Sequence, residues 1–72
     1  MIQNLKKAVP INTAYALLLD EIEKTKYDLN LAYSNFENSV EPDLIDSYIY
    51  QVNAIQMRYK FLLGRAKQIE ES

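Results

Sequence analysis

The segment FENSVEPDLI, residues 36–45, separates two long stretches that share one helical pattern. Pro42 has a fixed φ, lacks an N–H donor and disfavours the helical conformation for Glu41, so a helix arriving from the N-terminal side has to end before it. Proline also suits the first position of a new helix, where an N–H would have no partner. The sequence therefore predicts a turn at 39–41 and a second helix over 42–70.

Apolar residues on each side of this turn recur at alternating steps of three and four, which keeps them on one face of a helix. The first ladder contains Ile11, Tyr15, Leu18, Ile22, Thr25, Leu29, Ala32 and Phe36. The second ladder contains Ile45, Tyr48, Val52, Ile55, Tyr59, Leu62, Ala66 and Ile69. Together they predict an all-α fold, a coiled-coil-like antiparallel hairpin of two helices at 12–38 and 42–70.

The short turn also sets the register, because the numbers of facing residues in an antiparallel hairpin add up to a near constant. Here that constant is 80 or 81. The centre of the seam is then expected to be buried, namely Ile22, Leu29, Val52, Ile55 and Leu62. Asn12 or Thr13 is expected to cap the first helix. Residues 1–10 form a frayed lead-in, and residues 1–72 make one domain.

Composition limits the kinds of site that the chain can build. Its 72 residues include no Cys, His or Trp, so zinc and haem lose their usual ligands. A Ser or Tyr nucleophile would need a Lys or carboxylate partner in a pocket, and a two-helix hairpin offers no obvious one. We therefore expect no enzyme activity, no catalytic residue and no cofactor.

An acidic cluster surrounds the predicted turn and consists of Glu37, Glu41, Asp43 and Asp46. Carboxylate oxygens can bind a divalent cation, but the spacing is not that of a calcium loop. Acidic residues are also favoured at a helix start because of the helix dipole. Capping and solubility are the favoured interpretation, and a metal site remains the alternative.

The two flanks of the seam differ in polarity. On one side Glu21 is expected to reach Arg58 across the hairpin. The other side is apolar, and it contains the predicted interface residues Leu19, Tyr33, Ile49, Tyr50, Met57 and Leu63. A contiguous exposed apolar patch normally marks an interface, and domains this small commonly need oligomerisation to be stable. We therefore expect a homodimer that forms a four-helix bundle, with an unidentified protein partner as a further possibility.

Charge is divided unequally along the hairpin. Residues 27–57 contain five of the ten acidic residues and none of the eight basic ones, so the turn end is acidic and the open end basic. Packing the turn of one hairpin against the open end of another brings opposite charges together, which favours a head-to-tail dimer.

Nucleic-acid binding is the alternative function, through Lys24, Lys26, Tyr27 and Lys60 on an outer face. Such binding depends mainly on neutralising phosphates, and a net charge of −2 disfavours it. No apolar run approaches the roughly 20 residues of a membrane span. The absence of Cys and of a signal peptide fits a cytoplasmic protein.

The stretch over residues 36–67 resembles the YaaL-like family of small bacterial proteins of unknown function. The matching residues are Phe36, Glu41, Pro42, Leu44, Ile45, Asp46, Ile49, Tyr50, Arg58, Tyr59, Leu62, Leu63, Ala66 and Lys67. Such families have Asp before the proline, where this chain has Glu41. The resemblance implies a helical fold in a bacterial cytoplasm. Because such proteins are often encoded near recombination and sporulation functions, it also suggests a regulatory or accessory role.

Overall fold

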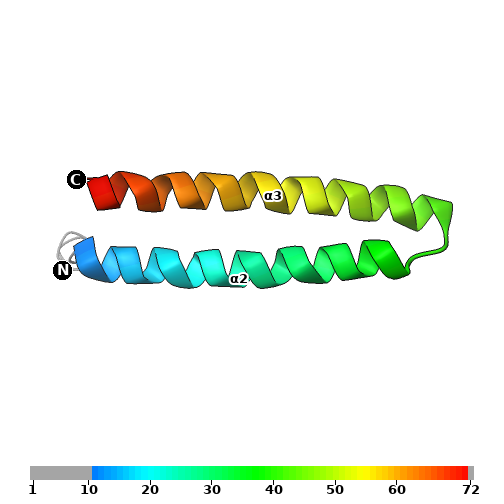
Figure 1. The fold of residues 1–72 in the computed structure, drawn as a ribbon, viewed down its shortest axis with the longest axis horizontal. Helices are drawn as coiled ribbons and strands as arrows, with labels where there is room; N and C mark the ends of the chain where they lie inside the picture. The colour runs from blue at the N-terminus through cyan, green and yellow to red at the C-terminus, as the bar shows by residue number, and fades with distance from the viewer. Residues whose placement is uncertain (1–10, 72) are drawn as a thin grey trace, which may run out of the picture.

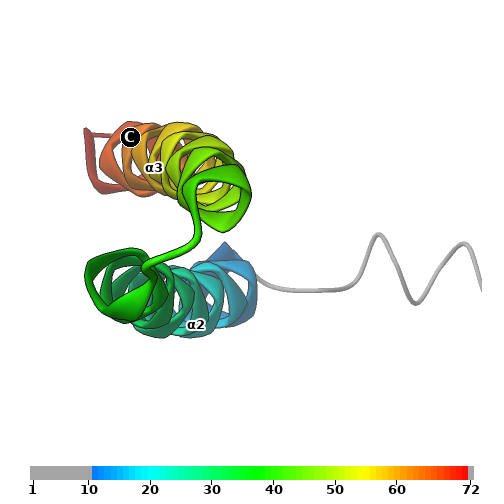
Figure 2. The same cartoon turned by 90° about the vertical axis from the view of Figure 1, so that its right-hand side faces the viewer.

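The computed structural model describes residues 11–71, which form two helices, α2 (Ile11–Asn38) and α3 (Pro42–Glu71). The helices lie side by side and antiparallel along their whole length, joined by a short turn at one end (Figure 1). Seen from the turn end they cross at a small angle, as helices with a coiled-coil seam do (Figure 2). The predicted all-α hairpin is confirmed.

The start of α2 differs from the prediction. Asn12 and Thr13 already belong to the helix, because α2 includes Ile11, so neither residue is the N-cap. Capping preference is a weak local signal, and a polar residue in the first turn of a helix is tolerated where it faces water. Both side chains are exposed. The cap itself, like the predicted lead-in at 1–10, lies outside the described residues.

The turn between the helices is closed by two backbone hydrogen bonds. The Ser39 N–H donates to the Phe36 carbonyl at 3.3 Å, and the Ile45 N–H donates to the Glu41 carbonyl at 2.9 Å. The second bond is the first helical bond of α3, so Glu41 occupies the N-cap position and Pro42 the first helical position. Asp43 lies in the first turn, near the positive end of the helix dipole.

Glu41→Asp is expected to raise the free energy of unfolding by about 0.5–1 kcal/mol. The shorter Asp side chain places its carboxylate where it accepts a hydrogen bond from the second or third N–H of the helix, which Glu reaches poorly. Urea denaturation of both proteins at the same concentration measures the difference. A loss of stability would show that Glu41 serves the turn in another way.

The core of the hairpin is a narrow seam. Five described residues are buried, and all belong to the predicted ladders: Ile22, Thr25, Ala32, Val52 and Ala66. Leu29, Ile55 and Leu62, also expected to be buried, are only half-buried because two helices leave both sides of the seam open. The ladder residue nearest the turn on α2, Phe36, is 37% exposed.

Thr25 is the most deeply buried residue of the seam, with 0% of its surface exposed. Its hydroxyl Oγ1 donates a hydrogen bond of 2.8 Å to the carbonyl of Glu21, one turn earlier in the same helix. The polar group is therefore satisfied within α2 and needs no partner from α3, so a polar residue at the centre of this seam carries no unpaired donor.

Candidate interaction surface

Four apolar side chains lie beside the seam on one side of the hairpin, and we call them the apolar flank. They are Leu19 and Tyr33 on α2, and Ile49 and Leu63 on α3, and each is between 40% and 42% exposed. The two residues on each helix are two heptads apart, which keeps them on the same side. Half of each side chain is therefore in contact with the hairpin while the other half faces solvent.

The middle and the turn end of the apolar flank are connected across the two helices. The Gln56 side-chain amide donates a hydrogen bond to the hydroxyl of Tyr33, which joins α3 to α2. Close by, the side chains of Tyr33, Phe36, Ile49, Val52 and Asn53 line a shallow hollow of about 80 Å³. The apolar surface at this end is therefore continuous from one helix to the other.

Tyr50 and Met57, the other two predicted interface residues, do not lie on the apolar flank. Tyr50 directly follows Ile49 of the flank, and Met57 directly follows Gln56, which lies one heptad after Ile49, so each lies about 100° further round the helix. They are 77% and 72% exposed. The structure thus brings four of the six predicted residues together and leaves these two on the outer face.

The opposite flank is polar, and its ion pair differs from the predicted one. Arg58 pairs with Asp28 at 3.2 Å, and not with Glu21. Helical side chains lean toward the N-terminus of their own helix, so Arg58 leans toward the turn, where Asp28 lies, while Glu21 leans toward the open end. Both partners are about half exposed, so the pair contributes up to about 1 kcal/mol.

The same lean explains the register of the other cross-helix contacts. Tyr15 bonds Glu70, Tyr33 bonds Gln56 and Asp28 pairs with Arg58, and the two numbers of each pair add up to more than 81. In an antiparallel hairpin the two side chains that meet both lean toward the N-termini of their own helices. The Cα atom of each residue therefore lies further toward the C-terminus of its helix than the point of contact, which raises the sum of the two residue numbers. The constant of 80 or 81 stays a prediction for the backbone, and it is too low for these contacts between long side chains.

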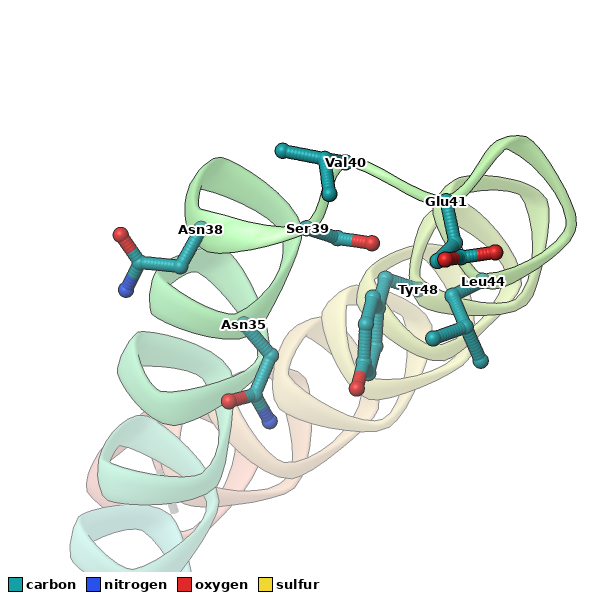
Figure 3. A pocket seen from close by; sticks show the side chains of 7 residues that line it. All are labelled: Asn35, Asn38, Ser39, Val40, Glu41, Leu44 and Tyr48. Atoms are coloured by element: carbon teal, nitrogen blue, oxygen red, sulfur yellow. The ribbon is translucent and has the colours of Figure 1, made fainter.

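The acidic residues near the turn do not gather into a cluster. Within residues 11–71, no group of three or more Asp or Glu side chains is placed to hold a metal ion. The turn instead has a hollow of about 310 Å³ that the sequence did not predict, lined by Asn35, Asn38, Ser39, Val40, Glu41, Leu44 and Tyr48. Asn35 of α2 and Tyr48 of α3 lie on its two sides (Figure 3). Of the four acidic residues, only Glu41 lines it.

The residues proposed for nucleic-acid binding are spread over both helices. Lys24, Lys26 and Tyr27 lie on α2, and Lys60 lies on α3. Lys26 is close to Glu23 of the same helix, at 3.9 Å.

No described helix is both long enough and apolar enough to cross a membrane.

The open end of the hairpin is joined by a hydrogen bond from the Tyr15 hydroxyl to the carboxylate of Glu70. This bond raises the pKa of Tyr15 above its usual value, because only the protonated phenol can donate it; desolvation and the negative charge of Glu70 act in the same direction. The bond therefore stabilises the folded state below the ordinary tyrosine pKa of about 10, and the stabilisation is lost as pH rises through the higher folded-state pKa.

Glu70→Gln is expected to lower the pKa of Tyr15 toward its ordinary value, since the amide no longer carries the charge that opposes ionisation. An NMR titration of the Tyr15 ring carbons in both proteins measures the shift. An unchanged Tyr15 pKa in the variant would show that this contact does not form in solution.

Comparison with models of protein families gives a match over residues 1–70 to a family described as a protein of unknown function, DUF2508. No curated protein matches the chain. No solved structure matches it either.

Proposed function

We propose that this chain, which belongs to the DUF2508 family of proteins of unknown function, acts by binding proteins. The family match is consistent with the resemblance to the YaaL-like proteins. It is a non-enzymatic helical module whose hairpins pair through the apolar flank into a homodimer, a four-helix bundle. The resemblance supports a place in the bacterial cytoplasm and a regulatory or accessory task.

The observation that carries this proposal is the imbalance between buried and exposed apolar side chains. Among residues 12–71, Ile22 and Val52 are the only large aliphatic side chains that are buried, whereas thirteen large hydrophobic side chains are exposed. A core of this size contributes little against the conformational entropy of ordering two long helices. Covering the apolar flank with a second hairpin supplies the missing burial.

Charge favours one orientation of the pair. Glu37 follows Tyr33 by four residues at the turn end of the flank, and Lys67 follows Leu63 by four residues at the open end. Each charge therefore lies one helical turn beyond an apolar flank residue. In a two-fold, head-to-tail dimer, Glu37 of one copy lies near Lys67 of the other, and the symmetry makes this pair twice.

Sedimentation equilibrium at tens of micromolar tests the dimer, and the melting temperature is expected to rise with protein concentration because association stabilises only the folded form. Glu37→Lys alone and Lys67→Glu alone are each expected to weaken the dimer by about tenfold, and the two together to restore it. A folded monomer would refute the homodimer. If the unmodified protein is a dimer but the double variant does not restore dimer formation, the homodimer stands and the head-to-tail orientation is refuted.

A further inference from the structure

A second uncharged stripe runs along the face of α3 that points away from α2, and we call it the outer stripe. Its seven residues follow steps of three and four: Ser47, Tyr50, Ala54, Met57, Phe61, Gly64 and Gln68. Such spacing holds them on one helix face over about six turns. The large members Tyr50, Met57 and Phe61 are 77%, 72% and 61% exposed, so each remains largely open to solvent. Helix α3 is therefore apolar on two opposite faces.

Gly64 gives a separate indication that the outer stripe is a contact surface. Glycine inside a helix costs about 1 kcal/mol relative to alanine. A Cβ added at this position would meet nothing within 4 Å, so no contact inside the hairpin requires a glycine there. Small residues such as Ala54 and Gly64 let the backbone of another helix come close. Close packing of a helix from another molecule would therefore explain why a glycine stands at position 64.

The charges beside the outer stripe indicate what kind of helix fits. Residues 47–69 contain four basic residues and no acidic one, although the whole chain has a net charge of −2. Helical spacing places Arg58 and Arg65 along one edge of the stripe and Lys60 and Lys67 along the other. Both edges of the stripe are therefore positively charged over its C-terminal half.

Most of these cations have no acidic partner within the hairpin. In the described part of the chain, ion pairs join Arg58 to Asp28 and Lys26 to Glu23, and no carboxylate lies within 4.0 Å of Lys60, Arg65 or Lys67. The Arg65 guanidinium lies 5.7 Å from the centroid of the Phe61 ring, on the stripe itself. In the proposed dimer Lys67 pairs with Glu37 of the second copy, so Lys60 and Arg65 are the cations left for another external acidic group.

We propose that the outer stripe of α3 binds an amphipathic helix of another protein, with an apolar seam that is bordered by Glu or Asp. Apolar side chains of that helix pack on Met57 and Phe61, its backbone approaches α3 at Gly64, and its carboxylates pair with the two basic edges. In this arrangement the apolar face of one helix recognises an amphipathic helix, with charge selection added. A nucleic acid fits less well, because Asp43 and Asp46 lie just before the stripe and repel phosphates.

The site is separate from the apolar flank. The flank lies beside the seam and its residues are about two-fifths exposed, whereas the outer stripe lies on the side of α3 opposite the seam. A dimer that forms through the flank leaves the stripe accessible on each copy. The homodimer and the second site can therefore be tested independently.

The test uses the full chain and a fluorescein-labelled three-heptad peptide with Leu at the seam positions and Glu on both sides, compared with a peptide that has Lys in place of Glu. Fluorescence anisotropy at about 50 and 200 mM NaCl is expected to show at least tenfold tighter binding of the Glu peptide, with the preference weakening at the higher salt. Equal binding of the two peptides would overturn the charge selection and with it the proposal.

Three variant proteins locate the binding site. Met57→Ser with Phe61→Ser is expected to weaken binding of the Glu peptide at least tenfold, whereas the matched pair Leu17→Ser with Leu31→Ser, exposed apolar residues of α2, leaves it unchanged. Gly64→Leu is expected to make the free protein more stable and to weaken peptide binding, two effects that a purely structural glycine would not combine. Sedimentation checks that all three proteins keep the oligomeric state of the unmodified chain.

Two outcomes would overturn the proposal in favour of another site or ligand. If Ile49→Ala with Leu63→Ala abolishes peptide binding while Met57→Ser with Phe61→Ser retains it, the peptide binds the apolar flank. If a poly-dT oligonucleotide binds more tightly than the Glu peptide and loses affinity in the Met57 and Phe61 variant, the stripe is a nucleic-acid site.

Discussion

Replacing Ile49 and Leu63 together with Glu is expected to convert the protein into monomers that are partly unfolded. Both side chains lie on the apolar flank, and both are 42% exposed in the hairpin, so Glu is accommodated there without a clash. In the proposed dimer the same positions are covered, and four carboxylates would have to be buried without partners. The dissociation constant should therefore rise at least about 100-fold, and the melting temperature should fall by more than about 10 °C.

The matched control for this variant is Leu17→Glu with Leu31→Glu. These two residues are 61% and 50% exposed on α2 and lie away from the apolar flank. The control carries the same change in charge and hydrophobicity, but it is expected to remain a folded dimer. Sedimentation and circular dichroism of both variants separate a specific interface from a general effect of four added charges per dimer. Equal loss of structure in both would contradict the proposed interface.

Ile22→Ala is expected to lower the free energy of unfolding by about 2–4 kcal/mol. Ile22 is 8% exposed and is one of the two large aliphatic side chains buried in the described seam. Its truncation removes buried methylene groups and leaves a cavity that two helices fill only partly. For a protein of this size the expected loss is a large fraction of the total stability.

Two further truncations calibrate this effect in the same helix. Leu29→Ala should cost less than Ile22→Ala, about 1–3 kcal/mol, because Leu29 is half-buried and already partly hydrated. Leu17→Ala should change the stability by no more than about 0.5 kcal/mol, because this side chain is 61% exposed. Urea denaturation at one fixed protein concentration measures all three. A different order would mean that the seam in solution differs from the one described.

Sequence periodicity predicts the fold and the buried positions, but it does not predict the contacts between surface side chains. All five buried residues belong to the two predicted ladders, because a step of three or four residues determines the helix face whatever surrounds it. The ion pair of Arg58 was assigned to the wrong carboxylate, because pairing depends on the direction in which a side chain leans. The cap of α2 was also misplaced, since several polar residues near a helix start satisfy the same weak preference.

The outer stripe shows a different limit of sequence reading. The sequence prediction assigns Tyr50 and Met57 to the same interface as the apolar flank, one position further round the second helix, although a step of one residue turns the helix by about 100°. Their spacing to Ala54 and Phe61, in steps of three and four, was the signal that assigns them to a face of their own. Exposure in the structure separates the two sets, with the flank near two-fifths exposed and Tyr50 and Met57 above two-thirds.

The short turn at 39–41 is expected to form first when the hairpin folds. Phe36 and Ile45 are nine residues apart in sequence, whereas Tyr15 and Glu70, which meet at the open end, are 55 residues apart. Closing the loop between Tyr15 and Glu70 first would cost more chain entropy than closing the turn. We therefore expect the contacts next to the turn to form first and those toward the termini to follow. Substitutions near Phe36 should therefore slow folding, while substitutions at Tyr15 or Glu70 should mainly speed unfolding.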